Sequence, residues 1–375
     1  MKRAMFLLPV ALTAALAAAL MPAAPGSPSL GYAAPVSAAH PVATDSRART
    51  TWDDFSGGFD HTGDDAKWAL TPLGPFPNGD GKASTSSAGL RVVPTGTNPR
   101  TGAPAFAYTT GKESDGGDGG LDHVKWYALA NHRASSGVLG FDADPGSVLT
   151  FDSTFSARTY GTGQHPFGDA VADPRNDLRL ASGAMTTIDQ ESNMVFDFFV
   201  TNEWVYAFYE RLPTPGADHV AFSYALPVER RSHPGQVNDL AISYDRSAGT
   251  VVWKVDGREV YKVDKIGFRP KDRTHLIIDL GGREELVAPR QLAPGFGMFV
   301  LLDADAPHLG TDRDGGPRAD GALVKLTDTT SYYDPDAGAP VPQTFVDPDS
   351  RPGNRLWGQG ARLDVRQLSI TGARY

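Results

Sequence analysis

The residue types best suited to chemistry are concentrated in one short segment near the middle of the chain, from Ile188 to Met194. Asp189, Glu191 and Asn193 occupy alternate positions within it, and Asp197 continues the same spacing. Successive side chains of a β-strand point to opposite faces, so an unbroken strand would place these polar side chains on one face. The pattern therefore predicts a polar, acidic patch on one side of a sheet.

The other face of this expected strand is apolar. Ile188, Met194, Phe196 and Phe198 alternate with the polar residues and would lie together on the reverse side. A polar face above an apolar one is typical of a sheet that packs its reverse side in a core. We therefore expect the acids to line the cleft side of a curved sheet, with Phe196 buried behind them.

Two acids at this spacing suit more than one kind of site. Same-face neighbours on a strand are about 6.6 Å apart at Cα, so the carboxyl groups of Asp189 and Glu191 could approach the roughly 5 to 5.5 Å of a retaining glycosidase pair. Adjacent acids also suit the binding of sugar hydroxyl groups, or a solvated sheet face. Asp197 is the best third acid if the strand is unbroken, and otherwise it flanks a hairpin. Catalysis, ligand binding and solvation remain open hypotheses.

Several aromatic and polar residues elsewhere are candidate ligand contacts. Trp126 precedes His132 by a few residues, and Tyr209 stands beside Arg211. An aromatic ring can stack on a sugar ring while the neighbouring polar group bonds its hydroxyls, although most aromatic residues serve the core. We assign Trp126, His132, Tyr209 and Arg211 as candidate ligand-binding residues, together with Asn193.

His165 lies in a glycine-lined segment, Gly161 to Gly168. A histidine in such a position can act as a base or a ligand, and it can equally be a plain turn residue. Other chemistries lack their motifs, since the chain contains no Gly-x-Ser-x-Gly, His-Glu-x-x-His or P-loop sequence. A nucleotide enzyme or a zinc protease is therefore excluded as an interpretation.

Cysteine and metal-ligand counts narrow the range of cofactors. With no cysteine, the chain forms no disulfide, thiolate zinc site or iron–sulfur cluster. Asp312 to Gly315 is similar to the start of a calcium loop, but Gly316 and Leu323 stand where further acidic ligands belong, so an EF-hand is excluded. We assign no metal site and expect no cofactor, with calcium at this loop left as an alternative.

Charge and the N-terminal segment indicate the compartment. The 375 residues carry a net charge of −9, which argues against a basic face for nucleic acid or an anionic membrane. Lys2 and Arg3 precede an apolar run, Ala4 to Met21, and small residues suited to cleavage follow at Ala24, Ala34 and Ala39. We expect residues 1–39 to be a signal peptide and processed leader, residues 40–50 to be flexible, and residues 51–375 to form a single, secreted, extracellular domain that is a monomer.

Short strand-like runs alternate with Gly, Pro, Asn and Asp throughout this domain, which predicts an all-β chain. Met194–Val200 and Trp204–Leu212 form the clearest hairpin, and 239–244, 250–256 and 259–263 form a three-stranded meander. Further strands are expected at 148–157, 274–280, 297–302 and 362–370. Two loops are long and polar, 112–121 and 303–321, and both are expected to be exposed.

A set of motifs in chain order resembles a known fold family. These are Thr51–Phe55, Gly89–Val92, Trp253–Gly257 (WKVDG), His275–Gly282 and Leu363–Ile370. They are similar to strands of the laminarinase-like glycoside hydrolases, and the whole chain also resembles an uncharacterised family of secreted bacterial proteins. The resemblance implies a concanavalin-A-like jelly-roll β-sandwich with long loops.

The same resemblance bears on function. In those hydrolases one strand carries Glu-x-Asp-x-x-Glu, whereas this chain has Asp189, then Glu191, and Asn193 or Met194 at the third position. The missing acid favours binding of a carbohydrate or another small polyhydroxylated ligand in the cleft. Hydrolysis by Asp189 and Glu191 is the alternative, as is a lyase reaction using His165. A binder or enzyme of a non-sugar small molecule is a third hypothesis.

Overall fold

The computed structural model describes residues 49–73, 75–108, 123–214, 216–304, 322–324, 330–334, 339–342 and 355–372. All of the described residues lie within one compact unit, Asp45–Tyr375. The expected leader, the loop 112–121 and the calcium-like segment beginning at Asp312 all lie outside the described residues.

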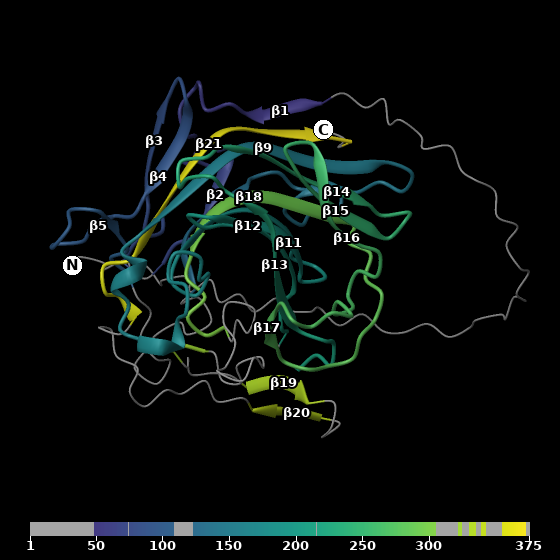
Figure 1. Ribbon diagram of the computed structural model, residues 1–375. Helices are drawn as coiled ribbons and strands as arrows, with labels where there is room; N and C mark the ends of the chain where they lie inside the picture. The colour runs from purple at the N-terminus through teal and green to yellow at the C-terminus, as the bar shows by residue number, and fades with distance from the viewer. Residues whose placement is uncertain are drawn as a thin grey trace, which may run out of the picture. The chain divides into compact units, whose positions relative to one another are not determined.

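Two large antiparallel sheets make up most of the described chain (Figure 1). The eight-stranded sheet has the order β16-β15-β14-β9-β21-β4-β3, with β1 also paired to β21. Its strands are β1 (Thr50–Asp53), β3 (Lys82–Ser86), β4 (Gly89–Val93), β9 (Val148–Tyr160), β14 (Asn238–Asp245), β15 (Thr250–Val255), β16 (Arg258–Val263) and β21 (Gly360–Thr371).

The nine-stranded sheet has the order β17-β13-β12-β11-β10-β18-β7-β2, with β8 also paired to β18. Its strands are β2 (Trp68–Leu70), β7 (Val124–Ala130), β8 (Phe141–Asp142), β10 (Ser182–Asp189), β11 (Met194–Val200), β12 (Trp204–Arg211), β13 (Phe222–Arg230), β17 (Leu276–Asp279) and β18 (Gln291–Phe299). Short elements complete the described chain: β5 (Gly96–Thr97), β6 (Pro104–Ala105), β19 (Thr330–Asp334), β20 (Ala339–Pro342) and the 3₁₀ turns η3 (Thr162–Gln164) and η4 (Gly168–Ala170).

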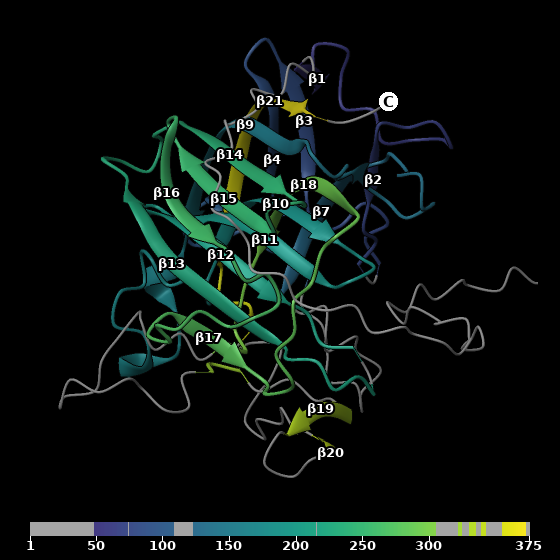
Figure 2. The ribbon, with the colours of Figure 1, turned by 90° about the vertical axis from the view of Figure 1, so that its right-hand side faces the viewer.

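The nine-stranded sheet curves away from the eight-stranded one, so that its concave face points away from the core between the sheets (Figure 1). Figure 2 shows β11, β12 and β13 side by side in this sheet. We call this surface the concave face.

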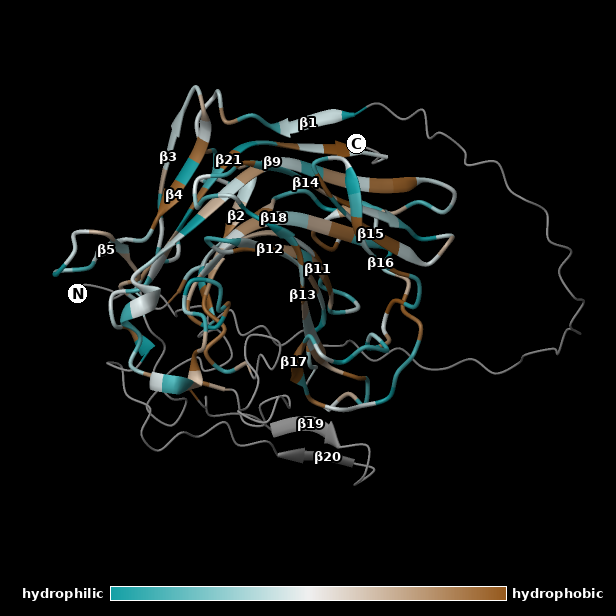
Figure 3. Cartoon of the chain, in the orientation of Figure 1, coloured by the Kyte–Doolittle hydropathy of each residue, from teal (hydrophilic) through white to brown (hydrophobic). Residues whose placement is uncertain are grey.

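Sequence pattern and burial agree strand by strand. Along β15 buried and half-buried residues alternate, as expected for a sheet with one face in the core and one face toward solvent. In β11 and β18, by contrast, every residue is buried, including those that point to the concave face. Figure 3 shows the hydrophobic residues of both sheets in brown. Continuous apolar runs therefore mark the nine-stranded sheet.

The core between the sheets is rich in aromatic rings. Phe196 of β11 is fully buried and meets Trp253 of β15 edge-on, with ring centroids 5.9 Å apart. Phe196 also stacks on Tyr209 of the neighbouring strand β12. The expectation that Phe196 is buried is thus confirmed.

The concave face carries a second apolar cluster. Phe199, Phe208 and Phe299 belong to it, with Tyr206 and the loop residue Leu178. Ring centroids of Phe199 and Phe208 are 4.5 Å apart, and those of Phe199 and Phe299 are 5.2 Å apart. The concave face is therefore an aromatic surface interrupted by a few polar side chains.

Most strands expected from the sequence are present. The hairpin β11–β12 and the meander β14–β15–β16 are confirmed, as is the all-β, jelly-roll β-sandwich class. The strand expected at 297–302 instead begins at Gln291 and ends at Phe299. In the part of the chain described, no helix has the length and apolar character needed to span a lipid bilayer.

Core packing around Phe196 gives the first prediction. Phe196→Ala should lower the free energy of unfolding by about 3 to 5 kcal/mol, because it removes buried ring surface and leaves a cavity between the sheets. Urea unfolding measures the change. The control is Leu286→Ala, since Leu286 is 72% exposed and its loss should stay within about 0.5 kcal/mol. Equal effects of the two substitutions would contradict the packing described.

Candidate functional site

The acidic segment expected to form a strand is instead a tight turn. Strand β10 ends at Asp189 and β11 begins at Met194, and these two residues pair across the hairpin. The Asp189 carboxylate accepts hydrogen bonds from the backbone amides of Glu191 (3.2 Å) and Ser192 (3.1 Å), which favours a turn over a continuous strand. Asn193 has a φ of 58°, a conformation that asparagine tolerates better than most residues. The expected unbroken strand was wrong.

This turn separates the two acids that were expected to share a face. Asp189 is 1% exposed, lies on the core side with Met194, and accepts a further bond from the Gln291 amide. Glu191 lies at the surface and forms a two-pronged ion pair with Arg290, whose hydrogen bonds hold the pKa of Glu191 below its usual value. Ile188 therefore faces the concave side, opposite to the expectation.

The aromatic candidates lie in the core. Trp126 is 1% exposed and packs near Phe59, so its ring is turned away from solvent. Tyr209 is fully buried, and its hydroxyl accepts a hydrogen bond from the Gly267 amide at 2.7 Å. Arg211 is nearly buried and pairs with Glu285 at 3.1 Å, while burial lowers its pKa.

Of the remaining candidates, His132 follows β7 and His165 follows η3, whereas Asn193 lies in the β10–β11 turn. His132 stacks on Phe141 with ring centroids 4.2 Å apart. Asn193 donates from its amide to the Thr214 hydroxyl at 2.6 Å. His165 follows η3 and accepts a hydrogen bond from the Phe167 amide at 3.2 Å, and burial lowers its pKa. Asn193 therefore shares the turn of Asp189 and Glu191, and the two histidines come from other elements.

Asp197 is the one expected acid that lies on the concave face. The β10–β11 pairing runs to Met185↔Phe198 and resumes at Ile188↔Val195. In the gap, the Asp197 carboxylate accepts the backbone amide hydrogen of Thr187 at 2.7 Å.

The backbone of Asp197 is held from the opposite side. Its carbonyl accepts the indole N–H of Trp253, which reaches across the core from the eight-stranded sheet, at 2.8 Å. Asp197 is 5% exposed. Two donors, one on each side of the sheet, therefore fix its position and orientation.

A second acid, Glu210 of β12, lies diagonally next to Asp197. Asp197 pairs with Phe208, and Glu210 is two residues further along the same face. Diagonal neighbours on antiparallel strands are about 7 to 8 Å apart at Cα. Glu210 is half-buried and accepts a hydrogen bond from the Ser223 hydroxyl of β13. We call Asp197 and Glu210 the acid pair.

Both carboxyl groups of the acid pair hold their protons more tightly than usual. Burial raises the pKa of Glu210 to about 7, with the nearby charge of Asp303 acting in the same direction. Burial also raises the pKa of Asp197 well above its ordinary value, and Glu210 adds to the rise. Neither acid has an ion pair among the described residues. The pair is therefore adapted to a proton or a neutral donor rather than to a protein cation.

Tyr127 of β7 lies on the same face, half-buried. Burial raises the pKa of its hydroxyl, and the charges of Asp197 and Glu210 contribute, while the Thr186 hydroxyl opposes the rise. Its ring packs edge-on against Phe299 at 5.8 Å.

Glycines in β18 make room on this face. A Cβ at Gly297 would lie 2.3 Å from the Phe299 ring, and a Cβ at Gly295 would lie 2.9 Å from the Thr186 hydroxyl. The absence of side chains at these positions lets Phe299 fold back over its own strand and keeps Thr186 uncovered by β18. The Phe299 ring and the Thr186 hydroxyl therefore occupy space that side chains at these two positions would take.

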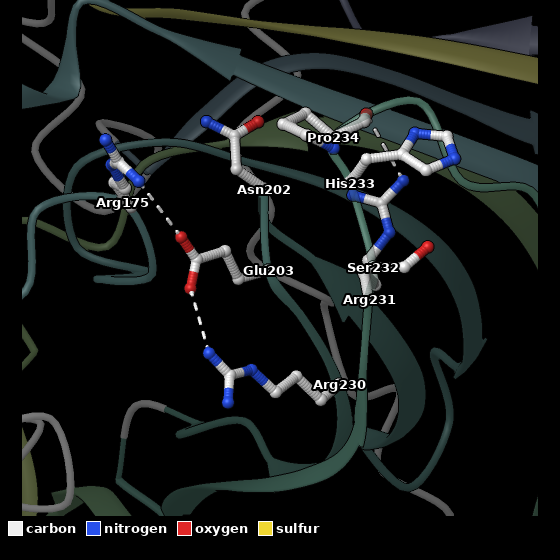
Figure 4. Close-up of a pocket in the computed structure, with 8 residues that line it drawn as sticks. All are labelled: Arg175, Asn202, Glu203, Arg230, Arg231, Ser232, His233 and Pro234. Atoms are coloured by element: carbon white, nitrogen blue, oxygen red, sulfur yellow. Dashed lines mark hydrogen bonds and ion pairs between the residues drawn. The ribbon is translucent and has the colours of Figure 1, made fainter.

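An open hollow of about 760 Å³ lies at the turn between β11 and β12 (Figure 4). Its lining is strongly charged and consists of Arg175, Asn202, Glu203, Arg230, Arg231, Ser232, His233 and Pro234. Glu203 lies between Arg175 and Arg230 in this view. In the described part of the chain no group of three His, Asp or Glu side chains is placed to hold a metal ion.

The alternation of residues along β12 distinguishes the face that carries Glu210 from the face that carries Tyr209. Period-two alternation along β12 places Tyr206, Phe208 and Glu210 on one face and Tyr209 and Arg211 on the other. Tyr209 and Arg211, the candidates expected from the sequence, face inward. Glu210 alternates with Tyr206 and Phe208, which belong to the buried aromatic cluster of the concave face.

Comparison with known proteins places the chain in a family. Residues 52–374 match a family described as "Family of unknown function (DUF6081)". The chain belongs to this family. A curated relative is "Uncharacterized protein L829" of Acanthamoeba polyphaga mimivirus, which is 31% identical. The matched region takes in 52% of this chain and 64% of the relative, so the chain spans somewhat less than two thirds of that protein. This relative is viral, whereas the sequence resemblance had suggested a bacterial family.

Solved structures with a similar fold share little sequence with the chain. A Crh5 transglycosylase is 12% identical, and the alignment covers 87% of this chain and 85% of the transglycosylase chain, with a TM-score of 0.37. A GH16 protein of Bacteroides ovatus, in complex with its product, is 9% identical, covers 85% and 98%, and has a TM-score of 0.39. A laminarinase catalytic domain of Thermotoga petrophila is 10% identical, covers 67% and 69%, and has a TM-score of 0.31. These similarities concern the fold alone.

The hairpin turn gives the second prediction. Asp189→Ala should lower the free energy of unfolding by about 1 to 3 kcal/mol, because buried amide donors lose their acceptor. Glu191→Gln should change it by less than about 1 kcal/mol, since an exposed ion pair contributes little. Chemical denaturation of both variants measures the difference. A larger loss for Glu191→Gln than for Asp189→Ala would disprove the assignment of Asp189 as the turn-forming acid.

The pKa of Glu210 gives the third prediction. The folded pKa is about 7 against an ordinary value of 4.5, so the folded state binds more protons between these values. The stability contributed by this group is complete below about pH 4.5 and is lost as the pH rises to about 7. Asp197 acts in the same direction.

Glu210→Gln should therefore flatten the fall in stability between pH 5 and about pH 7.5. Thermal melting across this range compares the variant with the parent protein. Glu191→Gln is the control. It should leave the change of stability with pH unaltered, because the pKa of Glu191 is lowered and this group titrates below the range. A parent protein whose stability rises over the same range through Glu210 would contradict the burial of this group.

Proposed function

We propose that the protein binds a saccharide on the concave face, with Asp197 and Glu210 as the principal polar contacts. The observation that carries the proposal is a buried acid pair with no cationic partner among the described residues. Such a pair is costly unless it is protonated or accepts hydrogen bonds from a ligand. Sugar hydroxyl groups are neutral donors and meet that requirement without bringing a second charge.

The surroundings of the acid pair support the same ligand class. Tyr127 and Trp204 are half-buried on this face and present aromatic surface beside the polar groups. A sugar ring offers C–H faces to an aromatic ring and hydroxyls to carboxylates, so both parts of the site would be used. Thr186 and Ser223 supply further hydroxyl groups on either side of the pair.

The proposal includes the setting expected from the sequence. Residues 1–39 serve as an export leader, the mature chain acts outside the cell as a monomer, and the site needs no cofactor. Of the acids proposed from the sequence, Asp197 is retained, and Glu210 takes the place of Asp189 and Glu191 as its partner.

A second candidate function, glycosidic bond hydrolysis, is favoured by one observation. The pKa of Glu210 at about 7 suits a general acid near neutral pH, and the neighbouring Asp197 cannot ionise readily at the same time. Glu210 would donate its proton to the leaving oxygen as the bond from that oxygen to the anomeric carbon breaks. Water would add to the anomeric carbon and give its proton to the Asp197 carboxylate.

The fourth prediction tests saccharide binding. Calorimetric titration of the folded protein with a panel of defined oligosaccharides should find a ligand whose affinity falls at least about tenfold in Asp197→Asn and Glu210→Gln, because each loses a carboxyl group that bonds a ligand hydroxyl. Glu191→Gln, at the surface ion pair with Arg290, should bind like the parent protein.

Release of reducing ends from the same panel separates the two functions. Release that is lost in Glu210→Gln supports hydrolysis, whereas binding without release supports recognition alone. Binding that survives both acid substitutions would refute the concave-face site. A panel that yields no bound saccharide would refute the proposed function as a whole.

A further inference from the structure

The hollow at the β11–β12 turn is locally positive in an acidic protein. Its lining contains three arginines, Arg175, Arg230 and Arg231, and one acid, Glu203, so its formal charge is positive while the chain as a whole carries −9. Arg175 comes from the segment between β9 and β10, and Arg230 ends β13. Segments distant in sequence therefore bring cations to one place (Figure 4).

The two outer arginines are held loosely. Arg175 reaches one oxygen of Glu203 at 3.4 Å, and Arg230 reaches the other at 3.9 Å. Each arginine side chain is 74% exposed, against 29% for the glutamate. A guanidinium has five N–H donors, so these contacts with Glu203 leave most donors of both groups available to an anion. Glu203 lies between the two arginines and contacts both, and all three side chains line the same hollow.

The third arginine forms a fixed part of the lining. Arg231 is 3% exposed and donates to the carbonyls of Ala157 (2.8 Å) and Gln236 (2.6 Å) and to the Ser156 hydroxyl (3.2 Å). These partners are neutral, so the charge of Arg231 is not cancelled by an acid among the described residues. Its Nε has no acceptor in the same part of the chain. A buried, uncancelled cation strengthens the attraction of the hollow for anions.

The hollow lies at the start of β12, the strand that also carries Glu210. Trp204 pairs with Arg230 at the start of β12, and Trp204 packs with the aromatic cluster of the concave face. Glu210 lies six residues further along the same strand, about 20 Å away at the usual rise. A ligand that contacts both regions would pass over Asn176 and Leu178, which pack on Tyr206 between Trp204 and Glu210.

We infer that the ligand is an acidic saccharide, whose carboxylate or sulfate group binds in the hollow between Arg175 and Arg230. This inference rests on the proposed function, since it names the chemical class of the ligand of the concave face. The acid pair would contact neutral hydroxyl groups of the ligand, and the arginines would contact its anionic substituent. The separation of the two regions along β12 keeps the ligand anion away from the acid pair.

The fifth prediction compares ligands and variants in a matched set. Oligouronates, sulfated oligosaccharides and neutral oligosaccharides of equal length are titrated into the parent protein and into the double variant Arg175→Gln/Arg230→Gln. Acidic ligands should bind at least about tenfold more tightly than neutral ones, and the double variant should remove that preference without weakening neutral ligands. The preference should also shrink as salt is raised, because both arginines are exposed.

Arg91→Gln is the matched control, since Arg91 is an exposed arginine of the other sheet that pairs with Asp364. It should leave both affinities unchanged. A preference for uronates identifies a carboxylate, and a preference for sulfated sugars identifies a sulfate. Equal binding of acidic and neutral ligands, lost in Glu210→Gln, would overturn the inference and leave the concave-face site intact. Absence of binding to every saccharide would overturn the proposed function and the inference with it.

Discussion

The position of Asp197 depends on an exchange of hydrogen-bond partners in the middle of the nine-stranded sheet. Its carboxylate takes the Thr187 amide, and its carbonyl takes the indole of Trp253 from the other sheet. Backbone groups buried in a sheet must be bonded, so a gap in the β10–β11 pairing requires such substitutes. The same contacts join the two sheets and present an acid on the concave face. Core packing and the candidate site are thus parts of one arrangement.

That arrangement explains why an acid is tolerated at so buried a position. An isolated carboxylate in an apolar environment favours its neutral form, and a second acid nearby strengthens that preference. Glu210 has the Ser223 hydroxyl as its donor, and Asp197 has the Thr187 amide. Each acid therefore keeps one fixed donor, and the rest of its bonding capacity faces the concave side.

Much of the fold could be predicted from the sequence because its elements are local and strongly patterned. The β11–β12 hairpin and the WKVDG meander follow from alternation and turn residues within short windows. The prediction for the segment around Asp189 was wrong for a physical reason. Four turn residues reverse the chain between Asp189 and Met194, so the alternation of faces cannot be continued across them as in one strand. Asp197 lies on the concave face, apart from Asp189, and Glu210 lies on the opposite face of β12 from Tyr209 and Arg211, the candidates that the sequence favours.

The hollow could not have been found from the sequence. Arg175, Glu203 and Arg230 are separated by long stretches of chain, and nothing in their local context sets them apart from other surface charges. The pairing of β11 with β12 and of β12 with β13 brings Glu203 and Arg230 to one end of the sheet, and Arg175 reaches the same place from the segment between β9 and β10. Sites formed by side chains at the ends of several strands depend on topology, which residue patterns within one strand do not contain.

Arg231 bonds to both sheets at once, through Ala157 of β9 and through the Thr201 carbonyl beside the β11–β12 turn. Its remaining acceptors, Ser156, Pro234 and Gln236, surround the guanidinium in different directions. A lysine has three donors at a single nitrogen and cannot reach so many separated oxygens. A lysine at position 231 would therefore leave several of these oxygens without a donor, so the junction between the two sheets requires an arginine.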